Sequence, residues 1–273
     1  MKIFFIINYA MNTAIQKANE AIKLLNNLNC LCAVETNKVG IFNNLVDGDS
    51  LNNLNYYDLI ISVGGDGTII SAAKFAIKFN LPILGINAGH MGFLCGLQGN
   101  ELENLKKLLI NDYFIRTRML LDVSYETSSW IAVNDAVITK PTYHGFVNVK
   151  VYDGKNFIIG YRADSVLFST PVGSTAYSLS NGGPISDPDL KFIAMSPICA
   201  HSLISRTNLF SEKSVLNVKI GSENEACLIL DGVVVKIIKQ NSMIQIKRSL
   251  KNLKLIYLKD IHFFELVKKK FFN

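Results

Sequence analysis

The sequence reads Leu59-Ile60-Ile61-Ser62-Val63-Gly64-Gly65-Asp66-Gly67-Thr68 where an apolar run meets a cluster of glycines. Residues 58–63 are almost continuously apolar, which is typical of a strand buried on both faces of a parallel sheet. Residues 64–67 are turn formers, and residues 68–79 read as a helix. The segment therefore predicts a strand, a tight turn and a helix, with Thr68 as the helix N-cap.

The same alternation continues on both sides of this segment. Residues 2–8 are an apolar strand-like run, residues 12–28 have helical spacing, residues 81–86 form a third strand-like run, and residues 101–109 are helix-like. The apolar face of the first helix carries Ile15, Ala18, Ile22, Leu25 and Leu28. Strands that alternate with helices predict an α/β domain with a parallel, Rossmann-like sheet and helices on its faces.

From about Tyr113 the pattern changes to short β-branched runs separated by Gly, Asn and Asp. This pattern predicts a mostly β domain. We therefore divide the chain into an α/β domain, residues 1–112, and a β-rich domain, residues 113–250. The runs expected as strands are residues 119–125, 130–138, 146–152, 157–161, 165–169, 215–220, 227–235 and 243–247.

Composition limits the class of protein. Hydrophobic residues make up 49% and charged residues 18% of the 273, which favours a compact globular chain over a disordered one. The net charge of +6 favours anionic partners such as nucleotides, but the basic residues are dispersed, so we expect no nucleic acid partner. No apolar run reaches the roughly 20 residues that cross a bilayer. We expect a cytoplasmic protein without a membrane partner.

The glycine cluster lies where chemistry is expected. A loop at the carboxyl end of a parallel strand is where open α/β sheets bind ligands, and glycines let backbone N–H groups approach a phosphate at the start of a helix. A carboxylate there needs a reason, because a phosphate repels it unless Asp66 binds a metal, accepts a proton or contacts a sugar hydroxyl. The alternative is that Asp66 only forms the turn; the strand and helix around it favour a functional role.

A second segment, residues 169–184, is rich in hydroxyls and small residues and contains one aromatic residue, Tyr177. Such a loop suits a polar ligand with a flat ring for the tyrosine to cover. Serine, glycine and proline are also what ordinary surface loops contain. Composition alone leaves both interpretations open.

The motifs resemble those of known kinases. Residues 64–68 resemble the Gly-Gly-Asp-Gly-Thr motif shared by NAD kinases, by diacylglycerol and sphingoid lipid kinases and, as a variant, by phosphofructokinases. Residues 173–180 resemble the Gly-Ser-Thr-Ala-Tyr-Ser-Leu-Ser signature of NAD kinases, which the lipid kinases lack in this form. The chain is identified as similar to the bacterial type of NAD kinase over most of its length. Further matches follow in the expected order at residues 85–94, 133–136, 162–165, 196–203 and 230–232.

This resemblance implies a two-domain fold and a reaction. A member of the family phosphorylates the 2′-hydroxyl of the adenosine ribose of NAD, with ATP or polyphosphate as donor, to give NADP. A divalent metal, most simply Mg²⁺, accompanies the donor, and we assign it no protein side chain. The resemblance also implies a homodimer or homotetramer and a C-terminal segment, residues 251–273, that returns to the first domain.

The resemblance assigns roles residue by residue. Asp66 matches the acceptor of the ribose hydroxyl proton. Phe93 is compatible with a place near the adenine or with a core position. Residues implied to bind the substrates are Gly64, Gly65, Gly67, Thr68, Asn134, Asp135, Arg162, Asp164, Thr175, Ala176, Tyr177, Ser178, Leu179 and Ser180.

The chain departs from the family pattern at four positions. Asp135, Ala163, Ala200 and Val233 stand where the family commonly has Glu, Gly, Pro and Gln. Asp135 keeps its charge but has a shorter reach, and Val233 lacks the hydrogen bond of the glutamine.

Two alternative functions stay open: a lipid kinase built on the same glycine loop, and a non-catalytic sensor that binds the dinucleotide.

Overall fold

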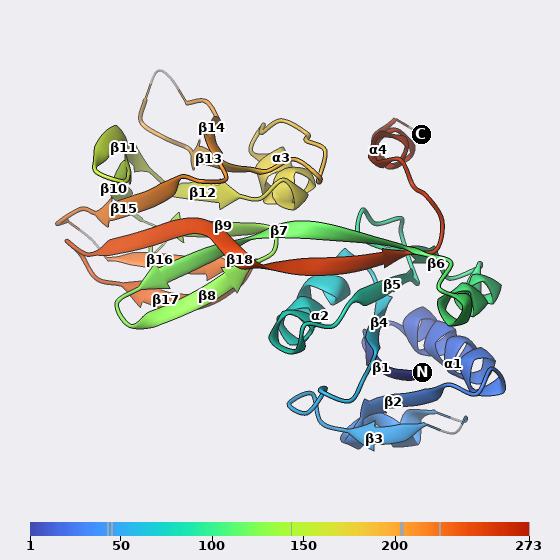
Figure 1. The fold of residues 1–273 in the computed structure, drawn as a ribbon. Coiled ribbons are helices and arrows are strands. Elements are labelled where there is room, and N and C mark those ends of the chain that lie inside the picture. The colour runs from blue at the N-terminus through green and yellow to red at the C-terminus, as the bar shows by residue number, and fades with distance from the viewer. Residues whose placement is uncertain (43, 45, 143, 203–204, 224, 273) are drawn as a thin grey trace. The chain divides into compact units, whose positions relative to one another are not determined.

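The computed structural model describes residues 1–42, 44, 46–142, 144–202, 205–223 and 225–272 (Figure 1). The chain forms two compact units: residues 1–117, joined by the chain from Leu253 onward, and residues 118–252. The division falls after Thr117, whereas the sequence pattern placed it after residue 112. It lies within a single strand, β7 (Phe114–Tyr125), so no loop marks it in the sequence.

The first unit is built on a parallel sheet, which confirms the predicted α/β class. Its strands follow the order β3-β2-β1-β4-β5, and neighbouring strands run parallel. The end of β18 and the short strand β6 both pair with β5. The bounds are β1 (Lys2–Ile7), β2 (Leu31–Glu35), β3 (Asp47–Asp49), β4 (Leu59–Gly64), β5 (Ile83–Asn87) and β6 (Leu97–Gln98).

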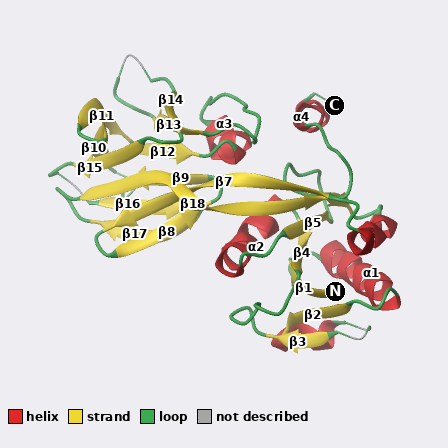
Figure 2. Ribbon diagram, viewed as in Figure 1, coloured by secondary structure: helices red, strands yellow, loops and turns green. Residues whose placement is uncertain are grey.

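Helices lie against this sheet (Figure 2). The apolar residues of the sheet are buried. Ile3, Phe5 and Ile7 alternate along β1 and join the apolar face of α1 in one buried cluster. Each such side chain contributes roughly 1.5–3 kcal/mol when fully buried. The helices and 3₁₀ segments are α1 (Asn12–Asn27), η1 (Thr36–Ile41), α2 (Asp66–Phe79), η2 (Leu102–Ile110) and α4 (Phe263–Phe271).

The helix after the glycine cluster begins earlier than predicted. α2 starts at Asp66, and Gly65 occupies the N-cap position in extended backbone without a side-chain hydrogen bond. Thr68 is therefore inside the first turn, and its assignment as N-cap is wrong. The extended Gly65 brings the chain into the helix before Thr68, and the Thr68 N–H already donates to the Gly65 carbonyl at 3.0 Å.

The second unit is a sandwich of two antiparallel sheets, as the mostly β pattern predicts. One sheet has the order β14-β13-β12-β9-β16-β17, and in the other β11-β10-β15-β18 run antiparallel beside the β7–β8 hairpin. Their facing side chains form one buried cluster, which includes Val149, Val218 and Phe168. The remaining bounds are β8 (Ser128–Ala132), β9 (Asp135–Thr139), β10 (Val147–Asp153), β11 (Asn156–Ala163), β12 (Ser165–Ser169), η3 (Val172–Thr175), α3 (Tyr177–Ser180), β13 (Phe192–Ile198), β14 (Asn208–Ser211), β15 (Val215–Ile220), β16 (Ala226–Leu230), β17 (Val233–Ile238) and β18 (Met243–Tyr257).

Two expected strands are each divided in the structure. The run 130–138 is interrupted between β8 and β9 because the backbone amides there bond a side chain, Asp231, and do not continue the ladder. The run 227–235 is a hairpin, since Asp231 and Gly232 adopt φ values of 48° and 82° and reverse the chain. Both breaks fall in the same part of the second unit.

Among the described residues, no helix has the length and apolar character that crossing a membrane requires.

Candidate functional site

The glycine loop lies at the topological switch point of the parallel sheet. β1 leads through α1 to β2 on one side, and β4 leads through α2 to β5 on the other, so the two connections diverge at the carboxyl ends of β1 and β4. Open α/β sheets bind ligands in the crevice at such a point. Gly64, the last residue of β4, begins the loop there.

The glycines of this loop serve two purposes. A Cβ atom on Gly64 would overlap the Thr68 side chain and lie 3.1 Å from the Asn8 Cβ, so this position is closed to larger residues. A Cβ on Gly65 or Gly67 would meet no described atom within 4 Å. The glycines at these two positions therefore leave open the approach to the first amides of α2, which have no acceptor within the helix.

Asp66 is held by two backbone amides. The Phe93 N–H donates to Oδ2 at 2.8 Å, and the Leu94 N–H donates to Oδ1 at 3.0 Å. Each oxygen of a carboxylate accepts at two lone pairs, so each keeps one free for another donor. Asp66 is half-buried at the start of α2, where the helix dipole favours a negative charge. The carboxylate is thus held in one orientation and can still accept a hydrogen bond from a hydroxyl group.

The loop after β5 is shaped to fit this carboxylate. A Cβ atom on Gly92 would overlap the Asp66 carboxylate, so only glycine lets the two segments approach this closely. Asn87 fixes the start of the loop, because its amide donates to Gln98 Oε1 at 2.8 Å and its Oδ1 accepts the Gly89 N–H at 3.3 Å. Gly92 and Asn87 did not figure among the predicted site residues.

In the second unit, Asp231 organises the second group of predicted residues. Its carboxylate accepts the N–H groups of Val133 at 2.8 Å, Asn134 at 2.7 Å and Asp135 at 3.1 Å. The Asp231 N–H donates in turn to the Asp135 carbonyl at 3.0 Å. These hydrogen bonds therefore join the hairpin turn at Asp231 to the break between β8 and β9. They fix the backbone of Asn134 and Asp135 relative to that turn.

The hydroxyl-rich segment is joined to the same point. Thr170 Oγ1 donates to the Val133 carbonyl at 2.7 Å and accepts the Gly173 N–H at 3.1 Å. The Thr170 N–H donates to the Asn134 carbonyl at 2.9 Å. A Cβ atom on Gly173 would overlap that same carbonyl, so glycine is required here. These contacts bring the start of the segment against Asn134 and Asp135.

Asp135 is a buried acid next to a second acid. Its residue is 5% exposed, and burial, followed by the nearby Asp231 carboxylate, raises its pKa from 3.8 to about 7. Burial also raises the pKa of Asp231, while its three backbone donors act in the opposite direction. The pKa of Asp135 therefore lies well above the usual range of an aspartate.

The residues of the predicted nucleotide loop differ in their exposure to solvent. Ser178 is buried and Tyr177 is 46% exposed on the short helix α3, so the tyrosine ring is accessible to a ligand. Thr175, Ala176 and Leu179 are half-buried and Ser180 is exposed. The structure brings this loop together with Asn134 and Asp135 in the second unit.

Arg162 and Asp164 lie elsewhere in the second unit. They precede β12, whereas Thr170 follows it, and the strand register pairs Ser165 with Thr139 and Ser169 with Asp135. At roughly 3.3 Å per residue, the length of β12 separates Ser165 from Ser169 by about 13 Å. The Arg162 guanidinium carbon lies 4.4 Å from the centre of the Phe146 ring. Asp164 Oδ1 accepts a hydrogen bond from Lys140 Nζ at 2.7 Å. Among the described residues, Arg162 and Asp164 therefore do not lie beside Asn134 and Asp135.

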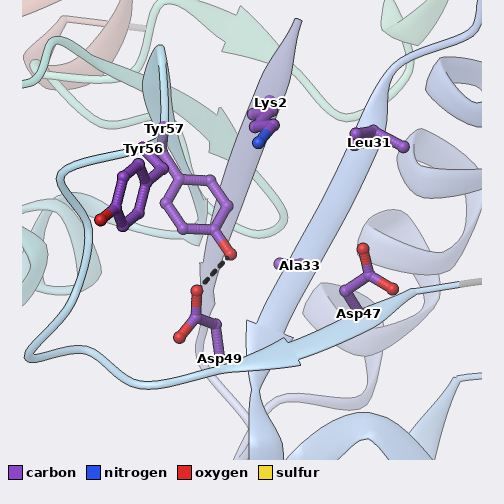
Figure 3. A pocket seen from close by; sticks show the side chains of 7 residues that line it. All are labelled: Lys2, Leu31, Ala33, Asp47, Asp49, Tyr56 and Tyr57. Carbon is purple, nitrogen blue, oxygen red and sulfur yellow. Dashed lines mark hydrogen bonds between the residues drawn. The ribbon is translucent and has the colours of Figure 1, made fainter.

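A separate pocket of about 190 Å³ lies at the β1–β2–β3 edge of the first unit (Figure 3). The Tyr57 hydroxyl donates to Asp49 Oδ2 at 2.9 Å, and burial together with this bond raises the pKa of Tyr57. None of the predicted site residues lines it. The lining residues are Lys2, Leu31, Ala33, Asp47, Asp49, Tyr56 and Tyr57.

Segments of both units match models of known protein domains. Residues 49–114 match the ATP-NAD kinase N-terminal domain, and residues 133–258 match the ATP-NAD kinase C-terminal domain. The chain is 39% identical over 220 residues to the NAD kinase of Caldanaerobacter subterraneus subsp. tengcongensis, covering 78% of each chain. It is 35% identical over 241 residues to the NAD kinase of Caldicellulosiruptor bescii, covering 86% of this chain and 92% of that one.

The chain belongs to the NAD kinase family.

Solved structures share the fold of this NAD kinase family member. A yeast NADH kinase complexed with NADH matches with a TM-score of 0.88 at 22% identity, covering 100% of this chain and 87% of that one. An NAD kinase from Archaeoglobus fulgidus in complex with ATP matches with a TM-score of 0.75 at 22% identity, covering 98% and 97%. The two-domain fold expected from the family resemblance is confirmed.

The departures from the NAD kinase pattern have structural settings. Ala163 is fully buried in the core of the second unit, so its methyl group packs among apolar side chains. Ala200 is partly buried against the same core. Val233 is 64% exposed at the start of β17, directly after the Asp231–Gly232 turn. We find no structural reason for a valine at that exposed position.

Sequence reasoning missed the residues that support the site. Asp231, Thr170, Gly173 and Gly92 all contact predicted site residues but were not among them. Asp231 and Gly92 lie in segments that match the NAD kinase family, so the signal was present as a motif. Their roles emerge only from contacts between segments far apart in the chain, such as the 96 residues between Asp231 and Asp135.

Proposed function

We propose that the chain phosphorylates the 2′-hydroxyl of the adenosine ribose of NAD, with ATP or polyphosphate as donor, and so produces NADP. The observation that carries this proposal is the Asp66 carboxylate, which two backbone amides hold at the start of α2. Membership of the NAD kinase family supports the choice of acceptor and donor. A lipid acceptor is not favoured, because the relatives named above are NAD kinases.

Asp66 would act on the attacking hydroxyl. A ribose hydroxyl is a weak nucleophile at neutral pH, so it must be aligned with the γ-phosphorus and must lose its proton as the bond forms. The bond to the hydroxyl oxygen forms, the bond between the γ-phosphorus and the leaving oxygen breaks, and the proton passes to the carboxylate. If the transition state is loose, orientation of the hydroxyl contributes more than basicity.

The loop glycines and the first amides of α2 would bind the donor phosphates. Gly65 and Gly67 leave the N–H groups open to approach, and the positive end of the helix dipole stabilises a phosphate. Asn134, Asp135 and the loop from Thr175 to Ser180 would bind the dinucleotide, with Tyr177 against a flat ring. Arg162 and Asp164 would make a separate polar contact.

A divalent cation, most simply Mg²⁺, would accompany the donor. Among the described residues, no group of three His, Cys, Asp or Glu side chains is arranged to hold a metal. The donor's phosphate oxygens would therefore be its main ligands, as is common for Mg²⁺ with nucleotides. When bound, the cation neutralises charge on the transferred phosphoryl group.

A coupled assay tests the proposed function. Purified protein, NAD and Mg-ATP are incubated with a dehydrogenase that accepts only NADP, and polyphosphate replaces ATP in a parallel reaction. We expect NADP to form with at least one donor, and no phosphorylation of a diacylglycerol or a sphingoid base. Phosphorylated lipid would support the lipid kinase, and NAD binding without NADP formation would support the non-catalytic sensor.

The assembly and location are also proposals. We propose a homodimer or homotetramer in the cytoplasm, in line with the family resemblance. Light scattering on the purified chain measures the assembly, and a monomer at micromolar concentration would contradict it. Fractionation of cells that express the chain tests the location, and recovery with the membrane fraction would contradict a cytoplasmic enzyme.

A further inference from the structure

The C-terminal helix packs on a residue next to the candidate catalytic acid. Phe93 is 7% exposed, and its ring centre lies 5.9 Å from that of Phe263 and 5.7 Å from that of Phe271 in α4. The Lys270 Nζ lies 4.4 Å from the centre of the same ring. All of these residues belong to the first unit. Phe93 is therefore a core residue held by α4 and not an exposed ring.

The backbone of the same phenylalanine holds the acid. The Phe93 N–H donates to Asp66 Oδ2, and the next amide, Leu94, donates to Oδ1. A single residue thus connects the aromatic side chains of α4 with the carboxylate. Asp66 and Lys270 also act in opposite directions on one buried thiol: Asp66 adds to the rise in the Cys95 pKa caused by burial, and Lys270 lowers that pKa.

The loop that carries these amides needs an anchor. It contains Gly89, Gly92 and Gly96, and glycine leaves a backbone with more conformational freedom than any other residue. Phe93 is the aromatic side chain between Gly92 and Gly96, and its packing, together with that of the buried Leu94 and Cys95, restricts the loop. The position of the Asp66 carboxylate therefore depends on how firmly the Phe93 ring is held.

We propose that α4 is a positioning element for the phosphoryl transfer, acting on Asp66 through Phe93. This inference rests on the proposed function. Val267 is the buried residue of α4, and Phe271 is 42% exposed, so the helix contributes little apolar burial to the unit. The contacts of α4 with Phe93 accordingly matter more for the orientation of the acid than for global stability.

The test uses three variants of the full chain. Phe271→Ala removes one ring from Phe93, Phe271→Leu keeps an apolar side chain there, and Phe272→Ala removes a neighbouring ring that is 77% exposed. We expect Phe271→Ala to lower kcat about tenfold, because misplacement of a reacting group is costly. The KM values for NAD and ATP should stay within twofold of wild type. Phe271→Leu should recover most of kcat, and Phe272→Ala should behave as wild type.

The outcomes separate the two proposals. If the wild-type chain forms no NADP with any donor, the proposed function fails. If the wild type is active and Phe271→Ala keeps its kcat, only the positioning role of α4 is overturned. A loss of kcat that is matched by an equal loss in Phe272→Ala, or that follows a fall in melting temperature, would show that α4 is merely structural.

Discussion

Asp66 in the first unit and Asp231 in the second use the same interaction for different ends. Each carboxylate accepts backbone amides from a segment distant in sequence, two for Asp66 and three for Asp231. A carboxylate accepts about four hydrogen bonds, so Asp231 has little capacity left while Asp66 keeps room for a hydroxyl. Backbone amides can thus make an acid structural or can orient it for chemistry, depending on how many of its acceptor sites they use.

The largest effect is expected at the acid with spare acceptor capacity. Asp66→Asn removes the proton acceptor and turns one backbone N–H toward an amide N–H, so kcat should fall by about 10³-fold. NAD affinity, measured by calorimetry, should stay within a few-fold of wild type. A parallel loss of NAD binding would mean that Asp66 is structural in the way that Asp231 is.

The reverse result is expected in the second unit. Asp231→Ala leaves three backbone N–H groups without their acceptor, at about 1 kcal/mol each. The free energy of unfolding should therefore fall by about 3 kcal/mol. For a chain of this size the melting temperature should fall by roughly 6–10 °C. Glu126→Ala is the matched control, because its carboxylate lies 4.0 Å from an exposed lysine and should contribute little. Equal shifts in the two variants would contradict the architectural role of Asp231.

Two glycines, one beside each carboxylate network, distinguish the two units further. Gly92→Ala would press a methyl group against the Asp66 carboxylate, and Gly173→Ala would press one against the Asn134 carbonyl. Each overlap costs about 2 kcal/mol. We expect the first variant to lose kcat by more than tenfold and the second to lose melting temperature and NAD affinity. Steady-state kinetics and thermal melts on both variants decide this, and identical profiles would show that the two sites are not distinct in role.

The smallest effect is a pH dependence confined to the second unit. The pKa of Asp135 is about 7 in the folded chain and 3.8 ordinarily, so between pH 4 and pH 7 the unfolded chain loses this proton while the folded chain retains it. Stability therefore falls as the pH rises through that window. Asp135→Asn, which cannot ionise, should match wild type at pH 4 and be more stable than wild type at pH 8. Denaturant unfolding at both pH values measures it; a variant less stable at pH 8 would show that the carboxylate is paired.

Much of the fold could be predicted because its local patterns agree with its tertiary structure. The apolar run before Gly64 became a central parallel strand, and the β-branched runs after residue 113 became strands of the sandwich. The pattern failed at residues 130–138 and 227–235, where apolar periodicity continues through a break. Long-range hydrogen bonds to Asp231 determine those breaks, and periodicity carries no information about them.

The candidate site could be predicted only in part, for the same reason. Asp66 and residues 173–180 belong to motifs that are read directly along the chain. The residues that hold them, such as Gly92 and Thr170, act through contacts with segments that lie far away in sequence. The separation of Arg162 from Asp135 likewise follows from strand register, which the sequence pattern does not specify.

The most direct test of the central claim is a single-turnover measurement of phosphoryl transfer at saturating NAD. Wild-type protein and Asp66→Asn are mixed with radiolabelled ATP, quenched at intervals and assayed for labelled NADP. We predict that the rate of the chemical step falls by about 10³-fold in the variant while NAD binding is retained. An unchanged rate of transfer in Asp66→Asn would contradict the claim that this carboxylate, held by the Phe93 and Leu94 amides, acts on the reacting hydroxyl.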